Sequence, residues 1–195
     1  MALAPRAVTG PLDRAITAAG ALAAAWRGRL VVIGGIAIVA RARPRLTEDL
    51  DLLIDVPEGC ENELVATMRG VGMIIDDEVL AEMLPGGLVP AWVPDGIARD
   101  RAHGVGIDVL FGDDAFGRSV LARATPLDLG GAVLLVASPE DLLLMKLDAN
   151  RPQDWDDALA LKDAFGDRLD RIYLDAWAER LEVADRVSAL LDRDE

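Results

Sequence analysis

Three aspartates have the residue type and spacing for metal-dependent phosphate chemistry. Asp49 and Asp51 are two residues apart in the apolar run 49–56, so on a β-strand both side chains point to the same face. Two adjacent carboxylates repel each other and raise the pKa of one of them, and a divalent cation removes this cost. Carboxylate oxygens suit Mg²⁺ or Mn²⁺, which bind a few carboxylates together with waters and substrate phosphates.

A third acid, Asp108, lies in a second alternating stretch, residues 105–111, whose apolar side chains face away from it. On a neighbouring strand, Asp108 would allow two cations to bind roughly 3.5–4 Å apart, where they activate an attacking hydroxyl and stabilise a leaving pyrophosphate. A short Asp-x-Asp pattern also occurs on solvated strand faces, so the spacing alone leaves both interpretations open.

Two glycines precede the first acid pair. Gly34 and Gly35 follow the apolar run 30–33 and precede a short helical stretch. Backbone N–H groups at the start of a helix bind anions, and glycine lets phosphate oxygens approach the main chain closely. A tight turn is the alternative, but the position between a strand and a helix, with the acid strand next, favours a phosphate site.

Lys146 is a further candidate for a phosphate contact. It lies beside Leu142, Met145 and Ala149 at helical spacing, and Lys162 is the only other lysine. The alternative is a packed helix from which a lysine extends its ammonium group to solvent.

Hydrophobic periodicity, helix caps and helix-breaking residues predict the helices and strands that position these residues. The N-terminal half predicts a helix over 11–28, a buried strand over 30–33, a helix over 36–42 that Pro44 ends, a strand over 49–56 and a helix over 61–69. The C-terminal half predicts strands and loops over 71–104, strands over 105–111 and 132–136, a helix from the Ser138 cap to about Asn150, and helical structure over 153–191 with a break at Gly166. The fold class is therefore α/β (α+β), with a core over 1–137 and a helical C-terminal region over 138–195.

Composition restricts the partners and the compartment. The single cysteine of this 195-residue chain fits a reducing compartment, and no apolar run reaches the length of a membrane span, so we expect a cytoplasmic protein without a membrane partner. The net charge of −14 counts against a general nucleic-acid binder. Two clusters leave open a local basic patch, with ordinary solvated side chains as the alternative: Arg41, Arg43 and Arg45, and Arg99, Arg101 and His103.

At this point the sequence resembles a known superfamily. The segment 31–37 around Gly34-Gly35, the segment Arg45-Leu-Thr47-Glu-Asp49-Leu-Asp51 and the strand around Asp108 resemble the signature of polymerase-beta-like nucleotidyltransferases. The Arg-x-Thr-x-Asp-Leu-Asp form and the segment 146–157 are similar to the AbiEii/MNT-like group, which is found in bacterial toxin–antitoxin and phage-defence loci.

The resemblance implies a small mixed sheet flanked by helices and a donor site for an NTP. It implies that Asp49, Asp51 and Asp108 bind Mg²⁺ or Mn²⁺ and are catalytic, with Asp108 helping to deprotonate the acceptor. It also implies a nucleotide-binding set, with Asp157 as a further candidate: Gly34, Gly35, Arg45, Thr47, Lys146 and Arg151.

Three functions remain in competition. The first is transfer of a nucleoside monophosphate from an NTP to an acceptor hydroxyl on a tRNA 3′ end, a protein or a small molecule, with a cognate antitoxin or toxin as a partner. The second is a catalytically degenerate binding module or antitoxin-like protein of the same fold, and the third is a phosphate hydrolase that uses the same metals. The intact set of three acids favours the first.

Overall fold

A mixed sheet forms the centre of the computed structural model, which describes residues 11–47, 49–94 and 104–192. Within these residues the sheet has six strands in the order β3-β4-β2-β1-β6-β5. The strands are β1 (Leu30–Ile33), β2 (Asp49–Ile54), β3 (Leu88–Pro94), β4 (Gly104–Phe111), β5 (Thr125–Asp128) and β6 (Val133–Val136).

The register of β2 with its two neighbours brings the acids together. β2 pairs with β4 in parallel, so that Asp51 lies opposite Asp108 and Asp49 lies opposite Gly106. On its other side β2 pairs antiparallel with β1, where Ile33 lies opposite Asp51. The third acid is therefore on the strand next to the first two, as the sequence predicted.

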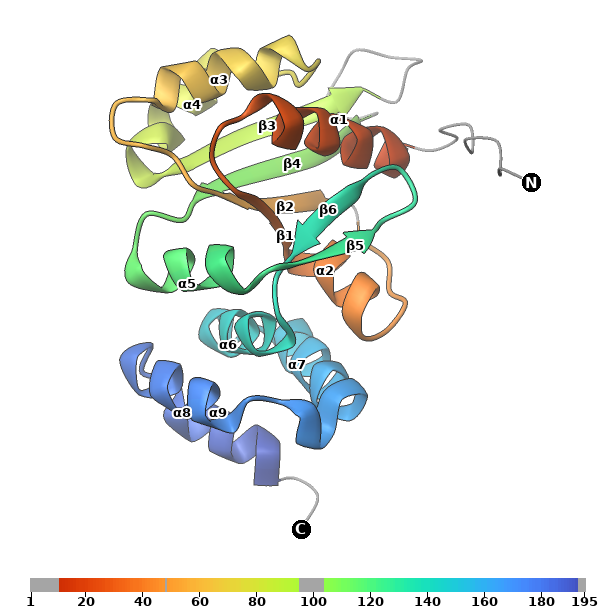
Figure 1. Ribbon diagram of the computed structural model, residues 1–195, viewed down its shortest axis with the longest axis vertical. Helices are drawn as coiled ribbons and strands as arrows, with labels where there is room; N and C mark the ends of the chain where they lie inside the picture. The colour runs from red at the N-terminus through yellow and green to blue at the C-terminus, as the bar shows by residue number, and fades with distance from the viewer. Residues whose placement is uncertain (1–10, 48, 95–103, 193–195) are drawn as a thin grey trace, which may run out of the picture.

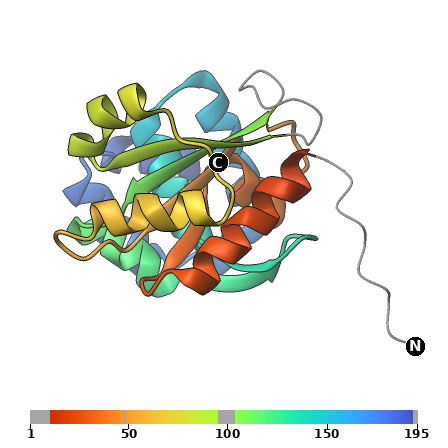
Figure 2. The ribbon, with the colours of Figure 1, turned by 90° about the horizontal axis from the view of Figure 1, so that it is seen from above.

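Helices cover both faces of the sheet, and a helical layer lies beyond one of them (Figure 1). The helices are α1 (Pro11–Ala25), α2 (Gly34–Arg41), α3 (Glu61–Gly70), α4 (Asp77–Met83), α5 (Ala115–Arg123), α6 (Pro139–Ala149), α7 (Pro152–Phe165), α8 (Arg171–Arg180) and α9 (Ala184–Leu191). Helix α1 packs on β2, β3 and β4 on one face, whereas α5 packs on β1 and β2. The view from above shows α1 and α3 side by side over the sheet (Figure 2).

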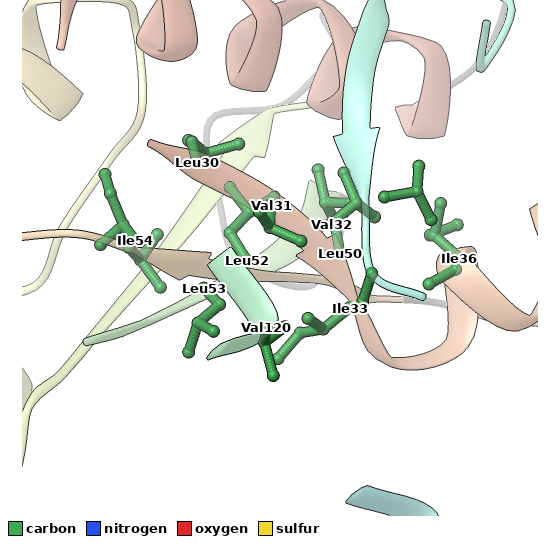
Figure 3. Packing of buried hydrophobic residues seen from close by; sticks show 14 of the residues in the cluster. Leu30, Val31, Val32, Ile33, Ile36, Leu50, Leu52, Leu53, Ile54 and Val120 are labelled. Atoms are coloured by element: carbon green, nitrogen blue, oxygen red, sulfur yellow. The ribbon is translucent and has the colours of Figure 1, made fainter. Parts of the chain in front are cut away.

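The alternation of side chains along β2 separates the core from the site. Leu50, Leu52 and Ile54 are fully buried, while Asp49 is exposed and Asp51 is half-buried. On the face of the two acids, Leu53 lies near Val120 of α5 (Figure 3), and it is buried there. One hydrophobic cluster runs from α1 through the sheet to α9.

The structure differs from the sequence-based elements in four places. Helix α2 includes Gly34 and Gly35 as its first residues rather than following them as a turn. The range 71–104 contains the helix α4, which Asp76 caps by accepting from two backbone N–H groups. The region after β4 adds α5 and β5, and the expected helical stretch 153–191 is divided into α7, α8 and α9.

The second division in that stretch has a local cause. The backbone of Glu182 adopts a positive φ of 58° between α8 and α9, a conformation that ends a helix and that no glycine signals here. The boundary at 137/138 stays a prediction, because the helical region shares the hydrophobic cluster with the sheet. No helix in the described part of the chain is long and apolar enough to cross a membrane.

Candidate active site

A cavity of about 680 Å³ opens on the sheet face that carries the acids. The sheet contributes Asp49, Asp51 and Asp108 to its wall, and the start of α2 contributes Gly34 and Gly35. Further lining residues come from the loop before β2, from α6 and from the start of α7: Arg45, Leu46, Thr47, Leu142, Met145, Lys146, Ala149, Arg151, Gln153 and Asp154. Every predicted site residue except Asp157 therefore lines one cavity.

Asp49, Asp51 and Asp108 form the acid wall of the cavity. Repulsion among their charges contributes to a raised pKa of Asp51. Burial raises the pKa of Asp51, and the charges of Asp108 and Asp49 raise it further. The backbone N–H of Gly35 and the ammonium group of Lys146 oppose the shift. This combination is the electrostatic signature of a carboxylate cluster that a cation would stabilise.

The carboxylates of Asp49 and Asp51 point to different strands. A Cβ atom at Gly34 would overlap Oδ2 of Asp51, and a Cβ atom at Gly106 would overlap Oδ1 of Asp49. Asp51 therefore leans towards β1 and α2, and Asp49 leans towards β4. In this arrangement no three acidic, histidine or cysteine side chains among the described residues form a closed metal-ligand cluster. The oxygen donors nevertheless fit Mg²⁺ or Mn²⁺ in type and in their shared strand face.

The two predicted glycines make room for the site. Gly34 has a positive φ of 61°, which favours glycine, and the carboxylate of Asp51 occupies the space that a side chain at position 34 would need. A Cβ atom at Gly35 would overlap the guanidinium group of Arg45 and the hydroxyl group of Thr47. The glycine pair thus brings the acid strand and the Arg45–Thr47 segment close to the start of α2.

Arg45, Lys146 and Arg151 form the basic wall of the cavity. Lys146 is the buried lysine of this wall. Its Nζ lies 3.0 Å from Oδ1 of Asp154 and 3.0 Å from Oδ2 of Asp157. Both acids lie on α7, three residues apart, so they face α6 together. The expected contact to phosphate is compatible with this position at the cavity wall, but in this structure the ammonium group is held between two carboxylates.

Asp157 is fully buried and connects Lys146 to two arginines. Its Oδ1 lies 3.6 Å from Nε of Arg45 and 3.6 Å from a terminal nitrogen of Arg43. Nε of Arg45 is buried and has no hydrogen-bond acceptor in the described part of the chain. The contact between Arg45 and Asp157 is therefore an ion pair without a hydrogen bond.

Arg151 and Asp154 line the cavity at the start of α7. Nε of Arg151 donates to Oδ2 of Asp154 at 2.6 Å, although the arginine side chain is 72% exposed. Burial raises the pKa of Asp154, but the hydrogen bonds from Arg151 and Lys146 outweigh this effect and lower that pKa to about 2.

The side chains of Arg41, Arg43 and Arg45, the first of the two clusters that left open a basic patch, do not gather at one place. Arg41 donates to the carbonyl groups of Val136 and Ala137 and to the hydroxyl group of Thr125, so it joins α2 to the β5–β6 edge. Arg43 and Arg45 instead turn towards Asp157. The second cluster, Arg99, Arg101 and His103, lies outside the described residues.

Sequence reasoning missed several residues of the site. It did not assign Asp154 as a partner of Lys146, although the acids at 154 and 157 share one face of the next predicted helix. Leu46 lines the cavity and is 96% exposed, and no sequence signal distinguished it from other leucines. Gly106 was also missed, because its relationship to Asp49 depends on the strand register.

The match to a protein family agrees with this geometry. The sequence profile of the family described as "Nucleotidyl transferase AbiEii toxin, Type IV TA system" matches residues 18–194. The chain belongs to this family. It is accordingly a nucleotidyltransferase, as the sequence resemblance implied, and the family's range covers both the acid strands and the helices of the basic wall. No curated protein matches the sequence.

A solved structure of low identity shows the same fold, and two further solved structures match over most of the chain. The antibiotic-resistance factor ANT(2'')-Ia is 18% identical over 91% of this chain and 97% of its own, with a TM-score of 0.56. An antigenic nucleotidyltransferase-like protein from Paracoccidioides brasiliensis is 17% identical over 93% and 92% of the two chains, with a TM-score of 0.49. JHP933 from Helicobacter pylori is 14% identical over 95% and 83%, with a TM-score of 0.49.

Proposed function

We propose that this member of the AbiEii family transfers a nucleoside monophosphate from an NTP to an acceptor hydroxyl with the help of Mg²⁺ or Mn²⁺. The observation that carries the proposal is one cavity that the three aspartates of the acid wall and the three cationic side chains of the basic wall line together. An NTP with its divalent cation has the complementary charges, because the cation prefers carboxylates and the phosphates prefer cationic groups.

On the acid side, Asp49, Asp51 and Asp108 would hold the cation. The raised pKa of Asp51, caused by burial and by the charges of Asp108 and Asp49, supports this assignment. When bound, the cation would stabilise negative charge on the reacting phosphate and on the leaving pyrophosphate.

On the basic side, Arg45, Lys146 and Arg151 would bind the triphosphate, together with backbone N–H groups near Gly34 and Gly35. The guanidinium group of Arg45 lies close to Gly35, and Arg45 lines the cavity, which supports a phosphate ligand there. Thr47 packs against Gly35 beside Arg45, so its hydroxyl group would lie close to the same ligand.

The chemical step would form a bond between the acceptor oxygen and the α-phosphorus. The bond from that phosphorus to the bridging oxygen breaks, and pyrophosphate leaves with the electron pair. We assign Asp108 as the group that accepts the proton of the acceptor hydroxyl, because it lies opposite Asp51 on the neighbouring strand.

The proposal also covers a protein partner and the class of acceptor. The family description names a toxin of a type IV toxin–antitoxin system, and we therefore expect a cognate antitoxin partner for this chain. Candidate acceptors are a tRNA 3′ end, a protein hydroxyl and a small molecule such as an aminoglycoside.

The test incubates the purified protein with Mg²⁺ or Mn²⁺ and each of the four α-labelled NTPs. Bulk tRNA, cell-extract protein and aminoglycosides are supplied separately as acceptors. We expect label on one acceptor class together with release of pyrophosphate. Release of inorganic phosphate without any labelled acceptor would instead support the hydrolase, and no reaction with any NTP would support the degenerate binding module.

A further inference from the structure

Gly106 lies directly across from Asp49 in the parallel pairing of β4 with β2. Two residues later on the same face of β4, Asp108 lies across from Asp51. Glycine inside a strand weakens it and commonly marks a close approach of another group. The group that approaches Gly106 is the carboxylate of Asp49.

A side chain at position 106 would meet only the end of the Asp49 side chain. A Cβ atom there would overlap Oδ1 of Asp49, but it would remain 3.3 Å from Cγ and 3.9 Å from Cβ. Asp49 is exposed, so its carboxylate can rotate away from the added atom. An alanine at this position would therefore move the carboxylate while leaving the strand pairing in place.

The direction of that movement matters for the acid wall. The carboxylate of Asp51 already lies against Gly34, on the side of β1 and α2. The space over Gly106 lets the carboxylate of Asp49 occupy the side of β4, the strand that carries Asp108. Filling this space would displace the carboxylate of Asp49 from the β4 side, and a ligand set loses affinity when its orientation is lost.

We infer that Gly106 is a positioning residue, which keeps the carboxylate of Asp49 on the β4 side of the acid wall and thereby sets the affinity for the divalent cation. The inference rests on the proposed function, because it takes the acid wall as the cation site. It assigns no direct contact between Gly106 and the cation or the nucleotide.

The test measures Mn²⁺ binding to the full chain by electron paramagnetic resonance, without nucleotide. We expect Gly106→Ala to raise the Kd for Mn²⁺ about tenfold, the lower end of the effect of residues that orient metal ligands. The melting temperature of the metal-free protein should change by less than about 2 °C, because only a rotatable side-chain end is displaced. A merely structural role predicts the reverse, a lower melting temperature with unchanged affinity.

Two further variants isolate the cause. Gly70→Ala is the matched control, because a Cβ atom at Gly70 has nothing within 4 Å, and it should alter neither measurement. In an Asp49→Ala background, Gly106→Ala should have no additional effect on Mn²⁺ affinity, since the displaced carboxylate is gone. An equal loss of affinity in that background would overturn the inference.

The outcomes separate this inference from the proposed function. Normal Mn²⁺ binding by the wild type with unchanged or tighter binding by Gly106→Ala contradicts the inference alone. Absence of Mn²⁺ binding by the wild type contradicts both.

Discussion

The ammonium group of Lys146 lies 3.0 Å from Asp154 and 3.0 Å from Asp157 in the buried contact between α6 and α7. Lys146 shares the compensation of these two buried carboxylates with arginines: Arg151 also donates to Asp154, and Arg43 and Arg45 each lie 3.6 Å from the fully buried Asp157. Removing one partner of a buried ion pair is far more costly than the net contribution of the pair, because a charge is left without compensation. Lys146 therefore supports the fold as well as the site.

We expect Lys146→Met to lower the free energy of unfolding by about 3 kcal/mol at neutral pH, as measured by urea denaturation. The double variant Lys146→Met/Asp157→Asn should recover part of this loss, because it also removes one of the two buried carboxylate charges that lose the lysine. A single variant as stable as the wild type would show that the two carboxylates do not depend on this lysine.

The stability of the protein should fall in acid through Asp154. Its pKa lies at about 2 in the folded state, below the value of about 3.9 for an unperturbed aspartate. A depressed folded-state pKa contributes stability above the unfolded value, and that contribution disappears as the pH falls from about 4 towards 2. The contribution at neutral pH is about 2 kcal/mol.

Asp154→Asn provides the measurement for this contribution. The difference in unfolding free energy between wild type and variant should be largest above pH ~5 and should shrink as the pH falls towards ~2. A difference that stays constant over this range would mean that the ionisation of Asp154 is not linked to folding.

Asp51→Asn should have opposite effects on activity and on metal-free stability. The substitution keeps the shape but removes a charged ligand, so pyrophosphate release should fall at least about a hundredfold. Burial and the charges of Asp108 and Asp49 raise the pKa of Asp51, so its ionised form destabilises the folded state at neutral pH. The melting temperature in chelator should therefore rise. Wild-type rates of pyrophosphate release would remove Asp51 from the catalytic assignment.

Mg²⁺ together with an NTP should stabilise the protein more than either ligand alone. A ligand at a hundredfold excess over its Kd adds about 2.7 kcal/mol when it binds only the folded state. For a chain of this size that corresponds to a rise in melting temperature of roughly 5–10 °C. A melting temperature unaffected by all four NTPs with either Mg²⁺ or Mn²⁺ would argue for the degenerate module.

The acid wall could be predicted from sequence because strand alternation is local information. Asp49 and Asp51 must share a face whatever the tertiary structure, and Asp108 repeats the pattern on a second strand. The choice of neighbour is not local, however, and only the register places Asp108 and Gly106 beside the first two acids. The helices around the sheet were less predictable where caps and turns, such as Asp76 before α4 and Glu182 after α8, determine their ends.

For the basic wall, prediction from the sequence is limited in a different way. The sequence identified Lys146 by its apolar surroundings, but the charge that a buried lysine sees depends on which helix packs against it. Asp154 and Asp157 are on α7, and the turn between α6 and α7 brings them to Lys146 through the positive φ of 54° at Asn150. Sequence periodicity contains no information about that turn angle.

Gly34→Ala combines a backbone effect with a steric effect at the acid wall. Gly34 has a φ of 61°, and an added Cβ atom would overlap the carboxylate of Asp51 and lie 2.6 Å from its Cγ and 2.8 Å from its Cβ. At Gly106 an added Cβ atom would overlap only a carboxylate oxygen of Asp49. At Gly34 it would instead overlap the whole side chain of the half-buried Asp51, from its Cβ to its carboxylate. We expect a loss of about 2 kcal/mol in the free energy of unfolding, together with loss of pyrophosphate release.

Gly59→Ala is the control that separates the two effects of Gly34→Ala. Gly59 also has a positive φ, of 77°, but a Cβ atom there has nothing within 4 Å. Gly59→Ala should lower the free energy of unfolding by about 1 kcal/mol, through the backbone conformation alone. It should leave pyrophosphate release unchanged. If the two variants lose equal stability and both keep activity, contact with Asp51 contributes nothing at position 34, and the glycine is required only for its backbone conformation.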